Sequence, residues 1–157
     1  MAHLDLPSEE FMLVQNFLEA GVRFLVIGGY ATKFYGCGKT TKDLDLLIDR
    51  EPNNARKAYP VIVRALGYQP KFQQDELCLA RKQLKFPNER VDILTPSDRI
   101  DFSLAWERRE RSLENGVVIP VVSKRDLIEI KKEAAKDLSR REKEMNDIAC
   151  LEKTGAA

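Results

Sequence analysis

The spacing of hydrophobic residues along the chain predicts an alternation of helices and strands. Apolar side chains recur every three or four positions in residues 8–20, as on one face of a helix, and Gly21 ends this pattern. Residues 22–27 form a run rich in β-forming side chains, and residues 30–35 are expected to form a short helix. In residues 43–48, aspartate and leucine alternate, which is typical of a strand with one polar and one apolar face.

The middle of the chain predicts one more helix, followed by short strands. Residues 53–66 carry apolar or small side chains at helical spacing, and Pro60 inside this segment predicts a kink or a break. Residues 98–116 are too highly charged to be assigned from their pattern, whereas residues 117–122 predict another strand. Between the helix and the charged segment, we expect short strands at 68–73, 77–80, 83–86 and 90–95.

Two helices are expected near the C-terminal end. Ser123 and Asp126 stand at the spacing of a helix cap, and the apolar positions that follow them carry a helix as far as Leu138. A second helix is expected over about 140–152. Together, these elements predict an α+β fold in which a mixed β-sheet is flanked by helices and followed by C-terminal helices.

Length and composition fit one domain and exclude several kinds of chemistry. The 157 residues are expected to form a single domain over 1–157, with a core over about 8–122 and a C-terminal helical element over about 123–152. The 26 Lys and Arg residues balance 25 Asp and Glu residues, so the net charge of +1 argues against an all-over basic nucleic-acid binder. The one histidine, His3, lies in the terminal segment, which nearly excludes Ser-His-Asp, Cys-His and zinc-imidazole catalysis. Catalysis would then depend on carboxylates, lysines, hydroxyls or a hard metal ion.

The cysteines and the hydrophobic segments predict a soluble, cytoplasmic protein. Cys37, Cys78 and Cys150 are far apart and form no Cys-x-x-Cys motif, so we expect reduced thiols rather than a disulfide framework. The N-terminal residues lack the basic and apolar regions of a signal peptide. No apolar stretch is long enough to cross a bilayer, so no membrane association is expected.

Three features could carry metal or phosphate chemistry, although each also has an ordinary structural explanation. The pair Gly28-Gly29 lets the backbone approach a phosphate, or forms a simple tight turn. Asp43 and Asp45 project from the same face of a strand, where a divalent cation would remove their repulsion; otherwise they begin a solvated strand. Asp92 lies in an apolar strand and would complete a cluster of three carboxylates if its strand pairs nearby, although one such aspartate usually faces solvent.

This combination of motifs resembles the nucleotidyltransferase superfamily whose best-known member is DNA polymerase β. The match is most similar to the small bacterial AbiEii-like nucleotidyltransferases of toxin–antitoxin systems. The segment from Lys131 to Ile148 matches the family's C-terminal pattern more loosely, and Glu144 stands where an aspartate is usual. The residues that carry the main resemblance are Gly28, Gly29, Lys39, Thr41, Asp43, Asp45 and Asp92.

The resemblance implies a role for each of these residues. Asp43 and Asp45 would be catalytic ligands of Mg²⁺ or Mn²⁺, which carries a nucleoside triphosphate. Asp92 would be the third catalytic and metal-binding carboxylate, and it would activate the attacking hydroxyl. The nucleotide-binding residues would be Gly28, Gly29, Lys39, Thr41 and Lys131.

The resemblance also implies a Mg²⁺-dependent enzyme that transfers a nucleoside monophosphate from a nucleoside triphosphate to a hydroxyl group. The acceptor would be RNA or tRNA, a protein or a small molecule, and an antitoxin protein would be a further partner. One alternative is a catalytically silent member of the fold that binds nucleotide or has a regulatory role. Another is a phosphohydrolase with Asp43 as nucleophile, but Asp43 begins its strand instead of ending it, as such a nucleophile should.

Overall fold

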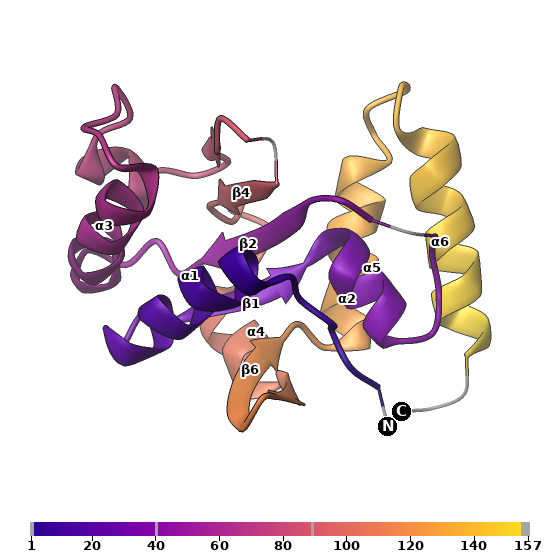
Figure 1. The fold of residues 1–157 in the computed structure, drawn as a ribbon. Coiled ribbons are helices and arrows are strands. Elements are labelled where there is room, and N and C mark those ends of the chain that lie inside the picture. Colours follow the sequence, from indigo (N-terminus) through magenta and orange to yellow (C-terminus); the bar gives the residue numbers. More distant parts are fainter. Residues whose placement is uncertain (1, 40, 89, 155–157) are drawn as a thin grey trace.

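Short apolar segments form a six-stranded mixed sheet with the strand order β3–β4–β2–β1–β6–β5 (Figure 1). The computed structural model describes residues 2–39, 41–88 and 90–154. β2 pairs with β4, and β1 with β6, in parallel, whereas the other neighbouring strands are antiparallel. The strands are β1 (Phe24–Ile27), β2 (Leu44–Ile48), β3 (Gln83–Lys85), β4 (Val91–Leu94), β5 (Glu110–Glu114) and β6 (Val117–Val121).

The helices gather at two ends of this sheet. α1 packs with α3 on one side, and α5 and α6 pack against each other at the opposite end (Figure 1). The helices are α1 (Ser8–Glu19), α2 (Gly28–Phe34), α3 (Pro52–Leu66), α4 (Phe102–Glu107), α5 (Lys124–Ala134) and α6 (Arg141–Lys153), with a 3₁₀ turn η1 (Gln74–Cys78). This mixed sheet with flanking and C-terminal helices confirms the fold predicted from the sequence.

The alternation of side chains in β2 separates the core from the face that carries the candidate site. Leu44, Leu46 and Ile48 are fully buried in the hydrophobic core. Because successive side chains of a strand point to opposite faces, Asp45 and Leu47 project from the other face of the sheet. The strand therefore anchors itself through one face and presents a carboxylate on the other.

The cap at the start of α5 is confirmed, whereas the break expected at Pro60 is wrong. The Ser123 hydroxyl accepts a hydrogen bond from the Asp126 amide at 3.1 Å and begins α5 as predicted. α3 continues through Pro60, although proline has no amide hydrogen to donate in the helix. Val61 and Ile62, which follow the proline, are buried in the core, and their packing outweighs the local preference.

Two of the strands expected in the middle of the chain do not form. Residues 68–73 contain no strand, and residues 77–80 fall at the end of η1 and just beyond it. Gln73 and Glu76 cap each other's backbone amides, which stabilises a helical turn instead of extended chain. The charged segment 98–116, left unassigned above, forms α4 and β5.

Cys37 and Cys150 form a disulfide, so the expectation of separate reduced thiols is wrong for this pair. Their Cα atoms lie 6.0 Å apart although 113 positions separate them in the sequence. The bond joins the loop after α2 to the last helix, α6. Cys78 remains a free thiol. In the part of the chain that the structure describes, no helix combines the length and the apolar character needed to span a bilayer.

Candidate active site

Two of the predicted catalytic aspartates lie side by side at the centre of the sheet. In the parallel pair β2–β4, Asp45 is directly opposite Asp92. The strands on either side of this pair place Ile27 of β1 opposite Asp45, and Lys85 of β3 opposite Asp92. Because residues opposite each other in a sheet share a face, these four side chains form one row across four strands. We call Lys85, Asp92, Asp45 and Ile27 the acid row.

The glycine turn at the start of α2 packs directly on this row. Gly28 has a φ of +67°, and a Cβ atom there would collide with the carboxylate of Asp45. At Gly29, a Cβ atom would lie 2.5 Å from Oγ1 and 2.7 Å from Cβ of Thr41. Both positions therefore need glycine for close packing, and Gly28 also needs it for its left-handed backbone. The turn brings backbone amides next to the carboxylates, as a phosphate site requires.

Burial and neighbouring charge make Asp45 an unusually weak acid when it is without a cation. Removal from water, together with the nearby carboxylates of Asp92 and Asp43, raises its pKa from 3.8 to about 7, and removal from water is the largest cause. Asp92 is itself buried, and its Oδ2 atom lies 3.5 Å from Nζ of Lys85. Its other oxygen, Oδ1, is buried and meets no hydrogen-bond partner among the described residues. Such an oxygen is costly unless it binds a cation or a donor.

The acid row forms the floor of a cleft of about 390 Å³. Asp43 lines this cleft from the loop before β2, where its backbone carbonyl accepts a hydrogen bond from Thr41 Oγ1 at 3.3 Å. Lys39 is exposed and does not line the cleft. The other predicted residues all do: Gly28, Gly29, Thr41, Asp43, Asp45, Asp92 and Lys131.

Lys131 lies in the wall of the cleft with its charge already paired. Its side chain is only 4% exposed, and Nζ lies 3.3 Å from Glu144 Oε1 and 3.0 Å from Asp147 Oδ2. Both acids belong to α6, and Arg140 lies 3.7 Å from the second oxygen of Glu144. These ion pairs join α5 to α6 beside the carboxylates. The predicted contact of Lys131 with a nucleotide stays a prediction.

Four basic or amide side chains that were not among the predicted site residues also line the cleft. Lys85 and Gln83 come from β3, a three-residue strand whose sequence gives no sign of a functional role. Arg140 and Lys143 come from the start of α6 and its preceding turn. Lys143 stands in the C-terminal segment that resembles the nucleotidyltransferase pattern, which was the only indication of a role for it in the sequence. Nothing in the sequence indicated a role for Arg140. The cleft thus combines carboxylates with basic side chains, as expected for an anionic ligand carried by a cation.

The donor set matches a hard divalent cation in chemistry. The ligands available are carboxylate oxygens, which Mg²⁺ prefers, and Asp92 Oδ1 is a buried oxygen without a donor among the described residues. Among residues 2–39, 41–88 and 90–154, no three carboxylate, thiol or imidazole side chains already stand together as a metal-binding group. Asp45 and Asp92 are the neighbouring pair, and Asp43 faces the same cleft from its loop. Small side-chain rotations and phosphate oxygens of a substrate would complete such a set.

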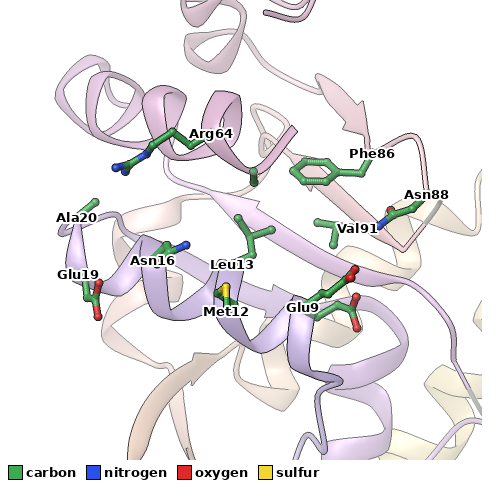
Figure 2. A pocket seen from close by; sticks show the side chains of 12 residues that line it. Glu9, Met12, Leu13, Asn16, Glu19, Ala20, Arg64, Phe86, Asn88 and Val91 are labelled. Carbon is green, nitrogen blue, oxygen red and sulfur yellow. The ribbon is translucent and has the colours of Figure 1, made fainter. Parts of the chain in front are cut away.

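A larger hollow of about 670 Å³ lies elsewhere, between α1 and α3 (Figure 2). Met12 and Leu13 of α1 lie on one side of it, Phe86 and Val91 lie across from them, and Arg64 of α3 lies above (Figure 2). None of the predicted catalytic or nucleotide-binding residues lines it. Size alone therefore does not indicate the functional site, and the chemistry points to the smaller cleft.

Solved structures with the same architecture are nucleotidyltransferase-like. A nucleotidyltransferase-like antigen from Paracoccidioides brasiliensis aligns with a TM-score of 0.57 and 16% identity over 89% of this chain and 72% of its own. A candidate nucleotidyltransferase from Thermotoga maritima aligns with a TM-score of 0.52 and 16% identity, covering 88% of this chain and 90% of its own. The chain has a nucleotidyltransferase-like fold. No protein-family model matches its sequence, and no curated protein is similar to it in sequence.

Proposed function

We propose that the protein is a metal-dependent nucleotidyltransferase that moves a nucleoside monophosphate from a nucleoside triphosphate to a hydroxyl acceptor. The observation that carries the proposal is the position of Asp45 opposite Asp92 in the parallel pair β2–β4, beneath the glycine turn. The nucleotidyltransferase-like fold supports it. In the reaction, a bond forms between the acceptor oxygen and the α-phosphorus, the bond from that phosphorus to the bridging oxygen breaks, and pyrophosphate leaves.

In this proposal, Asp43, Asp45 and Asp92 hold Mg²⁺ or Mn²⁺. The bound ion would neutralise charge that develops on the phosphoryl oxygens and on the leaving pyrophosphate. The glycine turn would accept the triphosphate through backbone amides, since only glycine leaves room there beside Asp45 and Thr41. Asp92, through its unpaired Oδ1, is placed to take the proton of the acceptor hydroxyl.

The identity of the acceptor follows from the resemblance alone and belongs to the same proposal. RNA, tRNA, a protein and a small molecule are the acceptors to test. The resemblance to AbiEii-like proteins extends the proposal to a cytoplasmic toxin–antitoxin system, in which an antitoxin protein would be the partner.

A second candidate is a nucleotide-binding protein without transferase activity. One observation favours it: Lys85 already pairs with Asp92, the carboxylate that would have to accept the proton. A metal ion or an acceptor hydroxyl would have to compete with this ammonium group for the carboxylate. Binding and transfer must therefore be measured separately.

Binding is tested by calorimetry with the non-cleavable analogue α,β-methylene-ATP in the presence of Mg²⁺. The wild type is expected to bind, and Asp45→Asn and Asp92→Asn are expected to lose about 100-fold or more in affinity, because each removes a charged ligand. Asp75→Asn is the matched control, since Asp75 is exposed on η1 and does not line the cleft. Equal affinity in all four proteins would refute the site.

Transfer is tested by incubating the protein with each nucleoside triphosphate, labelled at the α- or the γ-phosphate, and with RNA, tRNA or total protein. A nucleotidyltransferase transfers the α-label and never the γ-label. Transfer of the γ-label would indicate phosphoryl transfer instead. Binding that depends on Asp45, without transfer of either label to any acceptor, would favour the non-catalytic candidate.

A further inference from the structure

A second row of side chains lies beside the acid row on the same face of the sheet. Its residues lie two positions along each strand from those of the acid row. The register places Gln83 opposite Leu94, Leu94 opposite Leu47, and Leu47 opposite Leu25. We call Gln83, Leu94, Leu47 and Leu25 the apolar row, after its three leucines. Because a step of two residues keeps a side chain on the same face, this row continues the floor of the cleft away from the carboxylates.

A hollow of about 240 Å³ lies over the apolar row and opens from the cleft. Its floor includes Leu47 and Leu94, and α5 covers it through Ile130 and Ala134, which are four residues apart on one helical face. The residues that line both the hollow and the cleft are Ile27, Gln83, Leu94, Ile130 and Ala134. A ligand held at the acid row can thus extend directly into this hollow, which we call the apolar hollow.

The edge of the apolar hollow is polar and includes the basic side chains of Arg81 and Lys82. Glu133 of α5 lies there, and its Oε2 atom accepts a hydrogen bond from the Ser97 hydroxyl at 2.9 Å. Ser97 is itself buried, and its hydroxyl oxygen accepts a bond from the Arg99 amide at 3.3 Å. Ser97 thereby fixes the position of the Glu133 carboxylate. An apolar floor with a hydrogen-bonding group at its edge matches the chemistry of a nucleobase, which has apolar faces and a polar edge.

The space on the other side of Asp43 has the opposite character. It measures about 620 Å³, and Lys42, Lys85 and Arg90 give it three basic side chains beside the buried carboxylate of Glu10. Its apolar lining is limited to Pro7 and Tyr30, and five charged side chains surround them, so a nucleobase would gain less apolar contact there than over Leu47 and Leu94. The two spaces are therefore distinguishable, and the apolar one is suited to the base.

We propose that the apolar hollow is the nucleobase subsite of the cleft and that Glu133 is its specificity-determining residue. This proposal rests on the proposed function, because it assumes that a nucleoside triphosphate occupies the acid row. The base lies between the apolar row and the face of α5 that carries Ile130 and Ala134. Glu133 accepts a hydrogen bond from an N–H group at the edge of the base and thereby makes affinity depend on which base is bound.

The first experiment compares two probes by calorimetry in the presence of Mg²⁺: α,β-methylene-ATP and inorganic tripolyphosphate, which has no base. The wild type is expected to bind the nucleotide about tenfold or more tightly than tripolyphosphate, because burial of the base adds apolar contact. Ala134→Phe fills the hollow and is expected to remove this difference. Lys136→Phe is the matched control, because Lys136 is exposed and lines neither the cleft nor the hollow.

The outcomes separate this proposal from the proposed function. If neither probe binds the wild type, the proposed function fails, and the subsite fails with it. If both probes bind with equal affinity, or if Ala134→Phe binds the nucleotide as well as the wild type does, a phosphate site exists but the base does not occupy the hollow. Thermal unfolding of each variant verifies that the fold is retained, and Leu47→Asn is a second variant that disrupts the apolar floor without filling the hollow.

The second experiment tests Glu133 with ATP, CTP, GTP and UTP as competitors of the same analogue. Glu133→Gln keeps the size of the side chain but adds a donor, so at least one ratio of affinities among the four nucleotides is expected to change by about tenfold or more. Its affinity for tripolyphosphate is expected to stay that of the wild type. Unchanged ratios among the four nucleotides would overturn the role of Glu133.

Discussion

Replacing Asp45 by asparagine is expected to stabilise the metal-free protein at alkaline pH. Burial and two neighbouring carboxylates raise the pKa of Asp45 from 3.8 to about 7 in the folded state. A raised carboxyl pKa means that the folded state binds the proton more tightly than the unfolded state does. The free energy of unfolding therefore falls as pH rises from about 4 to 7, and the ionised carboxylate costs at most about 4 kcal/mol above that range.

The measurement is urea denaturation of the wild type and Asp45→Asn in EDTA at several pH values between 4 and 8. The two proteins should be similar in stability at pH 4, which is close to the unfolded-state pKa of 3.8, so that little of the pH-dependent loss has yet developed. At pH 8, Asp45→Asn should be more stable by a few kcal/mol. Asp75→Asn, an exposed matched control, should follow the wild type. Saturating Mg²⁺ should stabilise the wild type more than Asp45→Asn.

Two results would refute this reasoning. A variant Asp45→Asn that is no more stable than the wild type at pH 8 would show that the carboxylate is not strained by burial and by its neighbours. A difference in stability that is the same at pH 4 and pH 8 would show that the effect of asparagine does not arise from charge.

Three further predictions concern the surroundings of the acid row. In urea denaturation, Gly28→Ala should destabilise the protein by about 1–3 kcal/mol more than Gly36→Ala. Both glycines have positive φ, but only at Gly28 would a Cβ atom collide with a carboxylate. Equal losses of stability would exclude this collision. Lys131→Met should cost about 3–5 kcal/mol by the same measurement, since Asp147 loses its buried ammonium partner and Glu144 keeps only Arg140, and a loss below about 1 kcal/mol would contradict this. Cys150→Ser should lower the stability of the oxidised protein by about 2–5 kcal/mol, as followed by thermal unfolding, whereas Cys78→Ser should have little effect. Equal changes in the unfolding temperature of the two variants would argue against the disulfide.

The strands that carry Asp45 and Asp92 were predictable from sequence because each acid sits in an apolar segment. The alternation in residues 43–48 fixes which side chains of β2 face the core, so it also fixes the face of Asp45. Asp92 is likewise flanked by apolar residues, and this pattern predicts a buried strand that pairs with a neighbouring strand. What the pattern leaves undetermined is the partner strand, which the resemblance supplied and the β2–β4 register now gives.

Contacts between distant segments explain most of what sequence reasoning missed. Lys85 faces Asp92 only because β3 adds to the edge of the sheet, and nothing local in a three-residue strand predicts that position. The pairing of Cys37 with Cys150 depends on where α6 docks, which no spacing rule encodes. At Pro60, burial of the following residues overrides a local preference that the sequence does show.

The bond between Cys37 and Cys150 makes a covalent ring of the intervening chain. Asp43, Asp92 and Lys131 all lie within this ring, whereas Ile27 and the glycine turn precede it and stay attached through Cys37. A single proteolytic cut anywhere between the two cysteines would open the ring without releasing a fragment, and the pieces would separate only after reduction. The oxidised protein can therefore be nicked once, at any exposed turn of the ring, and still hold together the parts from which its cleft is made.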